Sequence, residues 1–513
     1  TRNNSDSVIK EWIEIYDERI NSFRDLHSSA EHFVREQRLA FNSIQSEFHG
    51  LSGSHIHRNQ VHELQSWLLE ESNDESDRIC LLIGNAGVGK SVVLKDLIIL
   101  LEARKIKHIC IKADSIDDNN NPVSLHDIQN AISCYAANHE KVVLIIDQID
   151  ALSQSLSNDR NKLNNLISIL SSLHNWPEVN AIVSCRSYDL EYDQTLNGLK
   201  ANAKIIELGK LSKEEVCNVL DRIDNSIKES IDSKTLSLLG TAQYLNTYCF
   251  LCNKSKSIQN FSSSIQLYDA LWSSCLQGAP TNVLPENIEY VLFEVARRIN
   301  DAETLKPTWV PDRKYESAFA YLASCGLILK DESCVSFFHQ TFFDYSLARL
   351  YVSKSKSFIT ELEGKFQGLE LRSTVKAVLD YERGHDPEFF VKDIQRLLTS
   401  LSVRLHLKLL AISVLASQEN PIKEEKAIIR DVCSGNIKLL VHFLRGVSSN
   451  NWFKTTLSIV KQHFPETTRE HELYQPILVF LSRYSYPFPS EVFKLIKEIK
   501  DEETFSVTCL ATS

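Results

Sequence analysis

Residues 78–91 read RICLLIGNAGVGKS, a short apolar run followed by a glycine-rich loop that ends in Lys90 and Ser91. The loop matches the pattern G-x-x-x-x-G-K-[S/T], and residues 92–97 (VVLKDL) continue it with a helical pattern. Glycines allow the backbone to curl so that its N–H groups and the N-terminus of the helix face an anion. This stretch therefore predicts a phosphate-binding loop, or P-loop, between a buried strand and a helix.

The residue types at the end of this loop suit a nucleoside phosphate and its metal ion. Lys90 is placed to neutralise the β and γ phosphate oxygens, and the hydroxyl of Ser91 is placed to ligate Mg²⁺. We therefore expect ATP or ADP, together with Mg²⁺, as the cofactors. The predicted nucleotide-binding residues of the loop are Gly84, Asn85, Ala86, Gly87, Val88, Gly89, Lys90 and Ser91.

The sequence around the loop alternates short apolar runs with amphipathic helical stretches. Continuous apolar runs of this length are typical of strands buried on both faces of a parallel sheet. The pattern predicts an α/β P-loop NTPase fold, in which helices flank a parallel sheet. The predicted strands cover residues 78–83, 106–113, 142–146, 180–185 and 204–208.

An acidic side chain follows the third predicted strand. Residues 142–146 (VVLII) deliver Asp147 at the carboxyl edge of the sheet, where P-loop proteins need a second Mg²⁺ contact besides Ser91. A carboxylate that only caps a helix is the alternative. Because Gln148 cannot take a proton, we assign the polarisation of water to Asp150.

Another predicted strand ends directly before Arg186. Its guanidinium would then lie at the same edge of the sheet, where it could bind the γ-phosphate and sense its presence. The alternative is a surface arginine paired with Asp189 or Glu191. The predicted catalytic group is therefore Asp147, Asp150 and Arg186.

Beyond residue 208 the sequence changes from strand-like to helical patterns. Ser212 and Glu215 have the spacing of a capping box, which marks the start of a helix. Residues 283–352 combine helices with a hairpin predicted at 326–338, and this order is typical of a winged helix. After residue 355 one helix follows another, at lengths that suit a stacked, all-α helical repeat.

These patterns predict five domains. They are an N-terminal helical extension (1–53), a P-loop nucleotide-binding domain (54–208), a small helical domain (209–280), a winged-helix domain (281–354) and a helical-repeat sensor region (355–513). Since the last residues have no capping character, we expect the natural protein to continue beyond Ser513. An apolar helical face is predicted in the extension, at Ile9, Trp12, Ile13, Tyr16 and Ile20.

Composition narrows the class of partner. The 513 residues carry a formal net charge of -11, which argues against a surface built to neutralise the phosphates of a nucleic acid. No apolar run approaches the roughly 18 residues of a membrane span, and the first residues do not form a signal peptide. Twelve scattered cysteines suit a reducing compartment, so we expect a cytoplasmic protein. We interpret the single CxxC, Cys249 and Cys252, as core packing rather than as a zinc or redox site.

Taken together, the P-loop, residues 146–152 (IDQIDAL) and residues 184–186 (SCR) resemble the NACHT-type STAND NTPases, particularly the bacterial antiviral (Avs-like) group. Residues 54–58 (SHIHR) resemble the segment that precedes the nucleotide domain on the adenine side. The resemblance implies that Ile56 and Arg58 contact the nucleotide.

The resemblance extends to residues 337–345 (FFHQTFFDY), which are similar to the winged-helix motif of the family. It implies that His339 reaches the ADP phosphates and holds a closed state; a core histidine is the alternative. One segment departs from the family. Residues 241–245 read TAQYL where relatives carry Thr-Pro-x-x-Leu, so we assign no site residue there.

The resemblance also implies a mechanism. The chain would be a regulatory ATPase that is folded on itself with ADP bound, opens when a protein ligand binds the C-terminal repeats, and self-associates with ATP. A membrane partner is not expected. An AAA+-like DNA-binding initiator or transcription regulator is the main alternative, and a small-molecule kinase is a third. The acidic composition and the long helical C-terminal region argue against these two respectively.

Overall fold

The computed structural model describes residues 24–497 except 71–77, 114–115, 117–123, 138–140, 154–160, 225–229, 256–258, 303, 332, 355–356, 366, 370 and 464–471. The chain forms two compact units, Thr1–Ala279 and Pro280–Ser513, and each is described by itself. The apolar face predicted within residues 9–20 lies outside the described residues.

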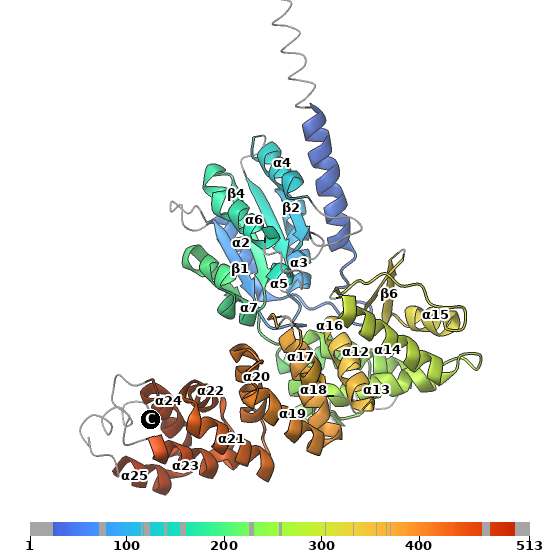
Figure 1. Cartoon of the computed structure of the whole chain (residues 1–513). Helices are drawn as coiled ribbons and strands as arrows, with labels where there is room; N and C mark the ends of the chain where they lie inside the picture. Colours follow the sequence, from blue (N-terminus) through green and yellow to red (C-terminus); the bar gives the residue numbers. More distant parts are fainter. Residues whose placement is uncertain are drawn as a thin grey trace, which may run out of the picture. The chain divides into compact units, whose positions relative to one another are not determined.

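The first unit is built on a five-stranded parallel sheet (Figure 1). The strand order is β2-β3-β4-β1-β5, so β4 lies between β1 and β3. The five strands that the sequence predicted are confirmed, each within one or two residues at its ends. They are β1 (Ile79–Ile83), β2 (Lys107–Lys112), β3 (Val142–Asp147), β4 (Val179–Cys185) and β5 (Ala203–Glu207).

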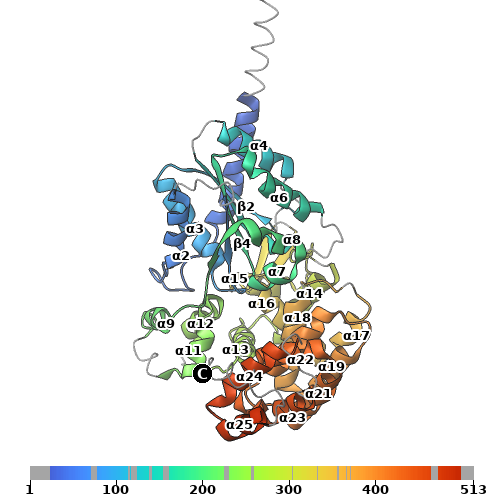
Figure 2. The ribbon, with the colours of Figure 1, turned by 90° about the vertical axis from the view of Figure 1, so that its left-hand side faces the viewer.

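Helices cover both faces of this sheet. Figure 2 shows α2 (Asn59–Leu69) and α3 (Lys90–Ala103) on one side and α4 (Leu125–Ala136) and α6 (Asn161–Ser171) on the other. Side chains along β3 alternate between the two cores: Leu144 packs with the cluster that contains α4 and α6, and Ile145 with the cluster that contains α2 and α3. The burial of both faces explains why the strands read as continuous apolar runs.

Short helices complete the first unit. The predicted capping box is present, because the Ser212 hydroxyl accepts from the N–H of Glu215 and the Glu215 carboxylate accepts from the N–H of Ser212. It begins α9 (Lys213–Leu220), which is followed by α11 (Ser233–Leu239), α12 (Ala242–Ser255) and α13 (Ser264–Gln277).

The second unit begins with helices and a hairpin. Helices α14 (Pro285–Ala302) and α15 (Glu316–Ser324) precede the antiparallel pair β6 (Ile328–Asp331) and β7 (Cys334–Phe337), and α16 (Gln340–Ser353) follows. The hairpin predicted from the sequence is confirmed. The winged-helix assignment remains a prediction.

The rest of the second unit is helical, as the sequence predicted. The helices are α17 (Phe358–Leu362), α18 (Leu371–His385), α19 (Pro387–Thr399), α20 (Leu405–Ala416), α21 (Lys423–Gly435), α22 (Ile437–Gly446), α23 (Phe453–His463), α24 (Tyr474–Ser485) and α25 (Pro489–Lys497). Helices α18, α20, α22 and α24 pack in succession, and α19, α21 and α23 form a second row (Figure 1). This two-row order is the arrangement expected for stacked helical pairs.

Within the described residues, no helix combines the length and the apolar composition that a membrane span requires.

Candidate nucleotide-binding site

The P-loop connects the end of β1 to the start of α3, as the motif predicted. Gly84 has no space for a side chain, because a Cβ there would lie 2.6 Å from the carbonyl oxygen of Leu208. Gly89 precedes the first turn of α3 with φ 103°, a conformation that L side chains rarely adopt. Position 84 therefore requires glycine because of the neighbouring backbone, and position 89 requires it because of its own backbone conformation.

Lys90 is the first residue of α3 and is 8% exposed. Its ammonium group donates to the carbonyl oxygens of Gly84 (2.7 Å) and Asn85 (3.0 Å), so the side chain folds back over the loop. Burial lowers the pKa of Lys90, while the nearby Asp150 carboxylate acts in the opposite direction. A buried cation that donates to two carbonyl oxygens can exchange these partners for an anionic ligand.

Two serine hydroxyls hold the carboxylate of Asp147. Ser91 donates to Oδ2 at 2.6 Å, and Ser184 donates to Oδ1 at 2.5 Å. Ser184 also accepts from the N–H of Gln148 at 2.8 Å. Asp147 and Ser184 are fully buried. The strand order accounts for the contact, because β4 carries Ser184 between β3 and the P-loop strand. The sequence motif did not identify Ser184 as a partner of Asp147.

Asp150 and Arg186 form the second pair at this edge of the sheet. The Arg186 Nε lies 3.1 Å from Asp150 Oδ2, and the Arg186 N–H donates to Oδ1 at 3.2 Å. The Asp150 side chain is 2% exposed and that of Arg186 is 22% exposed. Gln148 is exposed and has φ 59°, so it turns the chain sharply between Asp147 and Asp150. The structure thus joins Arg186 to Asp150, with a backbone contact that the sequence did not predict.

The segment to which we assigned no site residue lies against the P-loop. The N–H of Gln243, in the first turn of α12, donates to the carbonyl oxygen of Gly87 at 3.0 Å. A Cβ at Gly87 would lie 2.9 Å from the Cβ of Gln243. The Nε2 of Gln243 is buried and has no hydrogen-bond partner among the described residues. The first turn of α12, where the sequence predicted no site residue, therefore contacts the P-loop.

The predicted adenine-side residues lie just before α2. Ile56 is half-buried, and the Arg58 guanidinium donates to the carbonyl oxygens of Gly209 (3.0 Å) and Lys210 (3.4 Å). Burial lowers the pKa of Arg58, with Glu215 acting in the opposite direction. Its Nη1 is buried without a hydrogen-bond partner in the described part of the chain. Arg58 thus holds residues 209 and 210, which directly follow the Leu208 carbonyl that lies against Gly84.

His339 belongs to the second unit, where it caps α16. Its Nδ1 accepts from the N–H of Thr341 at 3.2 Å, and the ring is half-buried. Nδ1 also lies 2.8 Å from the Thr341 hydroxyl, which can donate or accept. These contacts hold the ring at the start of α16, and its predicted contact with a phosphate remains a prediction.

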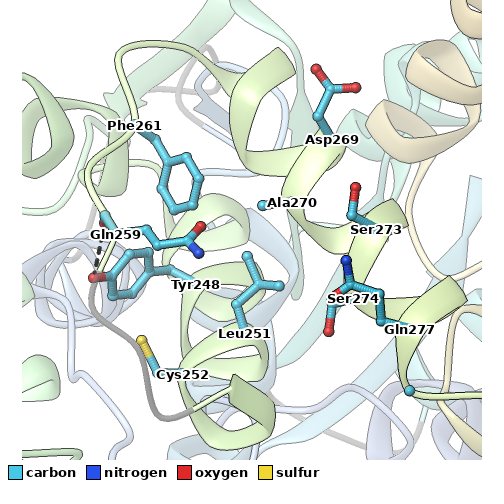
Figure 3. Close-up of a pocket in the computed structure, with 11 residues that line it drawn as sticks. Tyr248, Leu251, Cys252, Gln259, Phe261, Asp269, Ala270, Ser273, Ser274 and Gln277 are labelled. Carbon is cyan, nitrogen blue, oxygen red and sulfur yellow. Dashed lines mark hydrogen bonds between the residues drawn. The ribbon is translucent and has the colours of Figure 1, made fainter.

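A separate pocket of about 710 Å³ lies in the small helical region (Figure 3). Residues of α12 and α13 line it, and the Tyr248 hydroxyl at its wall donates to the carbonyl oxygen of Gln259 at 3.3 Å. Cys252 lines the pocket and Cys249 is buried, and burial raises the pKa of both thiols. Neutral, buried thiols agree with the packing interpretation of the CxxC pair.

The residues at the edge of the sheet fit a nucleotide with Mg²⁺. A hydroxyl and a carboxylate oxygen, from Ser91 and Asp147, are the hard ligands that Mg²⁺ prefers. Lys90 supplies a cation, and Gln243 and Arg58 each keep a buried nitrogen without a described partner. The structure brings five of the predicted residues together in the first unit: Lys90, Ser91, Asp147, Asp150 and Arg186. The predicted contact His339 belongs to the second unit.

Comparison with known families agrees with this site. Residues 51–183 match the profile of the family described as Novel STAND NTPase 5. The matched stretch contains the P-loop and Asp147. The fold and the site therefore define a P-loop NTPase, and the family match supports one of the STAND type. The NACHT type and the Avs-like group remain predictions.

Among curated proteins, the chain is similar to the Replication factor C large subunit of Methanococcus aeolicus, with 25% identity over 179 residues. The match covers 34% of this chain and 34% of that protein, so the chain spans about a third of this relative's length.

Among solved structures, the chain is similar to the Walker-type ATPase of Pyrococcus abyssi, with 12% sequence identity and a TM-score of 0.31. The match covers 59% of this chain and 98% of that chain. The ORC2 protein of Aeropyrum pernix has 12% identity, 61% and 97% covered, and a TM-score of 0.33.

Proposed function

We propose that this chain is an ATP-binding, slowly hydrolysing STAND signalling switch that acts in antiviral or immune-type defence. The observation that carries the proposal is the arrangement of Lys90, Ser91 and Asp147 around one glycine-rich loop. The family match at residues 51–183 supports the STAND type. The NACHT-like motifs in the sequence support the more specific class and its role in defence.

In this proposal each residue at the sheet edge has one task. The N–H groups of the loop, Asn85 to Gly89, face the phosphates. Lys90 exchanges its two carbonyl partners for phosphate oxygens, and Ser91 and Asp147 hold Mg²⁺. Bound Mg²⁺ neutralises the charge of the phosphate oxygens. Ile56 and Arg58 are assigned to the adenine side.

Arg186 and Asp150 are proposed to respond to the γ-phosphate. The sequence predicts that Asp150 polarises water, but one of its oxygens accepts from the Arg186 N–H and the other lies 3.1 Å from the Arg186 Nε. A carboxylate engaged in this way is less available to polarise water. Slow hydrolysis, and a sensing role for Arg186 that Asp150 orients, agree with this geometry.

The switch itself depends on the second unit. The proposal assigns to His339 a hydrogen bond to an ADP phosphate, and to the two rows of helices the binding of a protein ligand. We propose that ADP and His339 stabilise a closed form, and that the ligand opens it. The ATP-bound chain then self-associates.

Lys90→Ala tests nucleotide binding. It removes the cation of the loop, and two charge-assisted hydrogen bonds of roughly 1.5–3 kcal/mol each would be lost. Calorimetry with ATP and with ADP should therefore show affinity reduced by at least about a hundredfold. Lys213→Ala, which removes an exposed lysine of α9, is the matched control. Unchanged affinity in a folded Lys90→Ala protein would remove the P-loop from the site.

His339→Ala tests the switch. Loss of one hydrogen bond to a charged oxygen, roughly 1.5–3 kcal/mol, should weaken ADP binding by about ten- to a hundredfold. ATP binding should weaken less, and light scattering should show more assembly. His406→Ala removes another half-buried histidine of the second unit and should change neither property. Equal losses for ADP and ATP, or none, would reduce His339 to a helix cap.

The curated match favours one alternative, a DNA-binding AAA+-like protein, because that relative is named for replication. The net charge of -11 argues against it. Mobility shifts of duplex DNA in ATP and in ADP separate the two proposals. Binding that weakens steeply with salt would favour the alternative, and no shift would favour the switch.

A further inference from the structure

Two histidines and one aspartate meet beside the P-loop helix, apart from the predicted nucleotide contacts. His55 and His57 come from the segment before α2, and Asp96 comes from α3. One ligand atom from each residue can be chosen so that all three lie within 4.8 Å of one another. The side chains of His55 and Asp96 are 17% and 10% exposed, whereas that of His57 is 83% exposed. The group is therefore anchored in the protein and open to solvent on one side.

The hydrogen-bond partners of His55 determine its protons. Its Nδ1 lies 3.0 Å from the carbonyl oxygen of Ser46, which can only accept, so Nδ1 carries a proton. Its Nε2 lies 2.9 Å from Oδ2 of Asp96. With a proton on Nδ1, Nε2 directs its lone pair at this carboxylate oxygen, and a metal ion is bound through such a lone pair.

The Ser46 contact also matches the way in which proteins orient metal ligands. Histidines that bind metal ions usually donate their other ring N–H to a backbone carbonyl or a carboxylate. Internal hydrogen bonds hold the loop that supplies this carbonyl: the buried Ser54 hydroxyl accepts from the N–H of Phe48 and donates to the carbonyl oxygen of Leu51. His55 is therefore held with Nε2 directed at Asp96.

The position of His57 favours a metal site over a simple ion pair between His55 and Asp96. A protonated His55 beside Asp96 would need no second imidazole, yet His57 Nδ1 lies 3.9 Å from the same Asp96 oxygen. The two rings are nearly perpendicular, with centroids 4.4 Å apart. Two ligands about 2.0 Å from a tetrahedral zinc ion are about 3.3 Å apart. The distances of 2.9 and 3.9 Å to Asp96 bracket that value.

We propose that His55, His57 and Asp96 bind a divalent transition-metal ion of the zinc type, with water in the open position. Two imidazoles and one carboxylate favour zinc, cobalt or nickel over Mg²⁺ or Ca²⁺, which prefer oxygen ligands. Because Asp96 is on the helix that begins at Lys90, the ion would tie the segment that includes Ile56 and Arg58 to the P-loop helix. This structural metal site does not depend on the proposed signalling function.

The test uses Zn²⁺ alone, titrated into the full chain without nucleotide or Mg²⁺ in competition with a chromophoric chelator. The wild-type chain should bind one equivalent at this site. Loss of an outer-shell partner alone costs roughly 10- to 100-fold in metal affinity, so removing a ligand should cost at least as much. His57→Ala and Asp96→Asn should each show this loss. Because His57 is largely exposed, His57→Ala should keep its fold, as circular dichroism will check.

Two controls complete the experiment. His126→Ala removes an exposed histidine of α4 and should leave zinc affinity unchanged. Lys90→Ala should also keep it, which separates this site from the nucleotide site. Affinity should fall in acid, because protons compete for both imidazoles. Equal affinity of the wild-type and His57→Ala chains, or no stoichiometric binding by the wild type, would overturn the proposal and leave an imidazolium–carboxylate pair.

Discussion

Buried carboxyl groups occur in both units, but their surroundings differ. In the first unit, Asp147 accepts from two serine hydroxyls and Asp150 pairs with Arg186. In the second unit, the fully buried Glu382 of α18 faces Asp393 of α19, and neither Glu382 oxygen receives a hydrogen bond from a described N–H or O–H group. Burial and the charges of Asp393 and Asp386 raise the pKa of Glu382 to about 9.

The difference shows that burial alone does not decide the state of a carboxyl group, because its partners also act on it. Burial disfavours the charged form of every carboxylate, and hydrogen-bond donors or cations restore it. At the P-loop edge, hydroxyl groups and a guanidinium group surround carboxyl oxygens that a metal ion can use. In the helical repeats the Glu382 carboxyl stays protonated and can donate to Asp393, whose pKa burial also raises. The first arrangement suits a ligand site, and the second holds two helices together.

Glu382→Gln should give the largest effect. Since the pKa of Glu382 is raised in the folded state, its contribution to stability is complete below about pH 4.5 and is lost as pH rises towards 9. Between pH 5 and pH 8 the loss should reach roughly 4 kcal/mol. Glutamine keeps the shape and a donor, so the variant should lose this pH dependence and be more stable than wild type at pH 8.

Urea unfolding of both proteins across this pH range measures the effect. The difference between them isolates Glu382 from the other titrating groups. Glu388→Gln, an exposed position on α19, should leave the pH dependence as in the wild type. Parallel curves for the wild type and Glu382→Gln would mean that the buried carboxyl group is not protonated.

Arg383→Ala tests Glu425, a buried carboxyl group of the second unit that forms an ion pair with an arginine. Arg383 donates to Glu425 at 2.5 and 3.3 Å and links α18 to α21; the Glu425 side chain is fully buried, and that of Arg383 is 27% exposed. Breaking a buried pair costs 3–5 kcal/mol, and the partial exposure of Arg383 lowers this to about 2 kcal/mol.

Chemical denaturation measures this loss of stability. Arg396→Ala, which breaks the more exposed pair with Glu363, should cost clearly less and is the matched control. If both substitutions had the same small effect, Glu425 would be stabilised by its backbone contact with Ile422 rather than by Arg383.

Asp150→Ala and Arg186→Ala should give the smallest free-energy effects, about a tenfold decrease in phosphate release each, or about 1.4 kcal/mol. ATP should stay bound, because Ser91 and Asp147 are unchanged. If Asp150 acts by orienting Arg186, the double variant should be no slower than either single variant. Single-turnover hydrolysis measures all three. If the rate decreases of the two single variants multiply in the double variant, Asp150 acts independently of Arg186, as expected for a group that polarises water.

Sequence reasoning was most successful for local features. The five strands and the capping box at Ser212 depend on residues close together in the chain, and the structure confirms them. The P-loop was predicted for the same reason, since glycine, lysine and serine at fixed spacing define both conformation and chemistry. Asp147 could be found because an apolar strand ends there.

Other contacts could not be read from the sequence. The sequence placed Ser184 near the end of a strand but predicted no partner for it. The pairing of β4 with β3 brings its hydroxyl to Asp147, to which it donates. Gln243 has no motif of its own, yet its backbone holds the P-loop at Gly87. The roles of Arg58 and His339 remain predictions, because each depends on where a nucleotide lies.

By itself, the sequence determined the parallel sheet with its phosphate-binding loop and the helical character of the second unit. Apolar periodicity and glycine spacing carry this information locally. Only the tertiary structure decided which buried carboxyl groups have hydrogen-bond donors, which helix supports the loop, and that His55 meets Asp96. These outcomes join residues on different elements, and their distances depend on strand order and helix packing rather than on spacing along the chain.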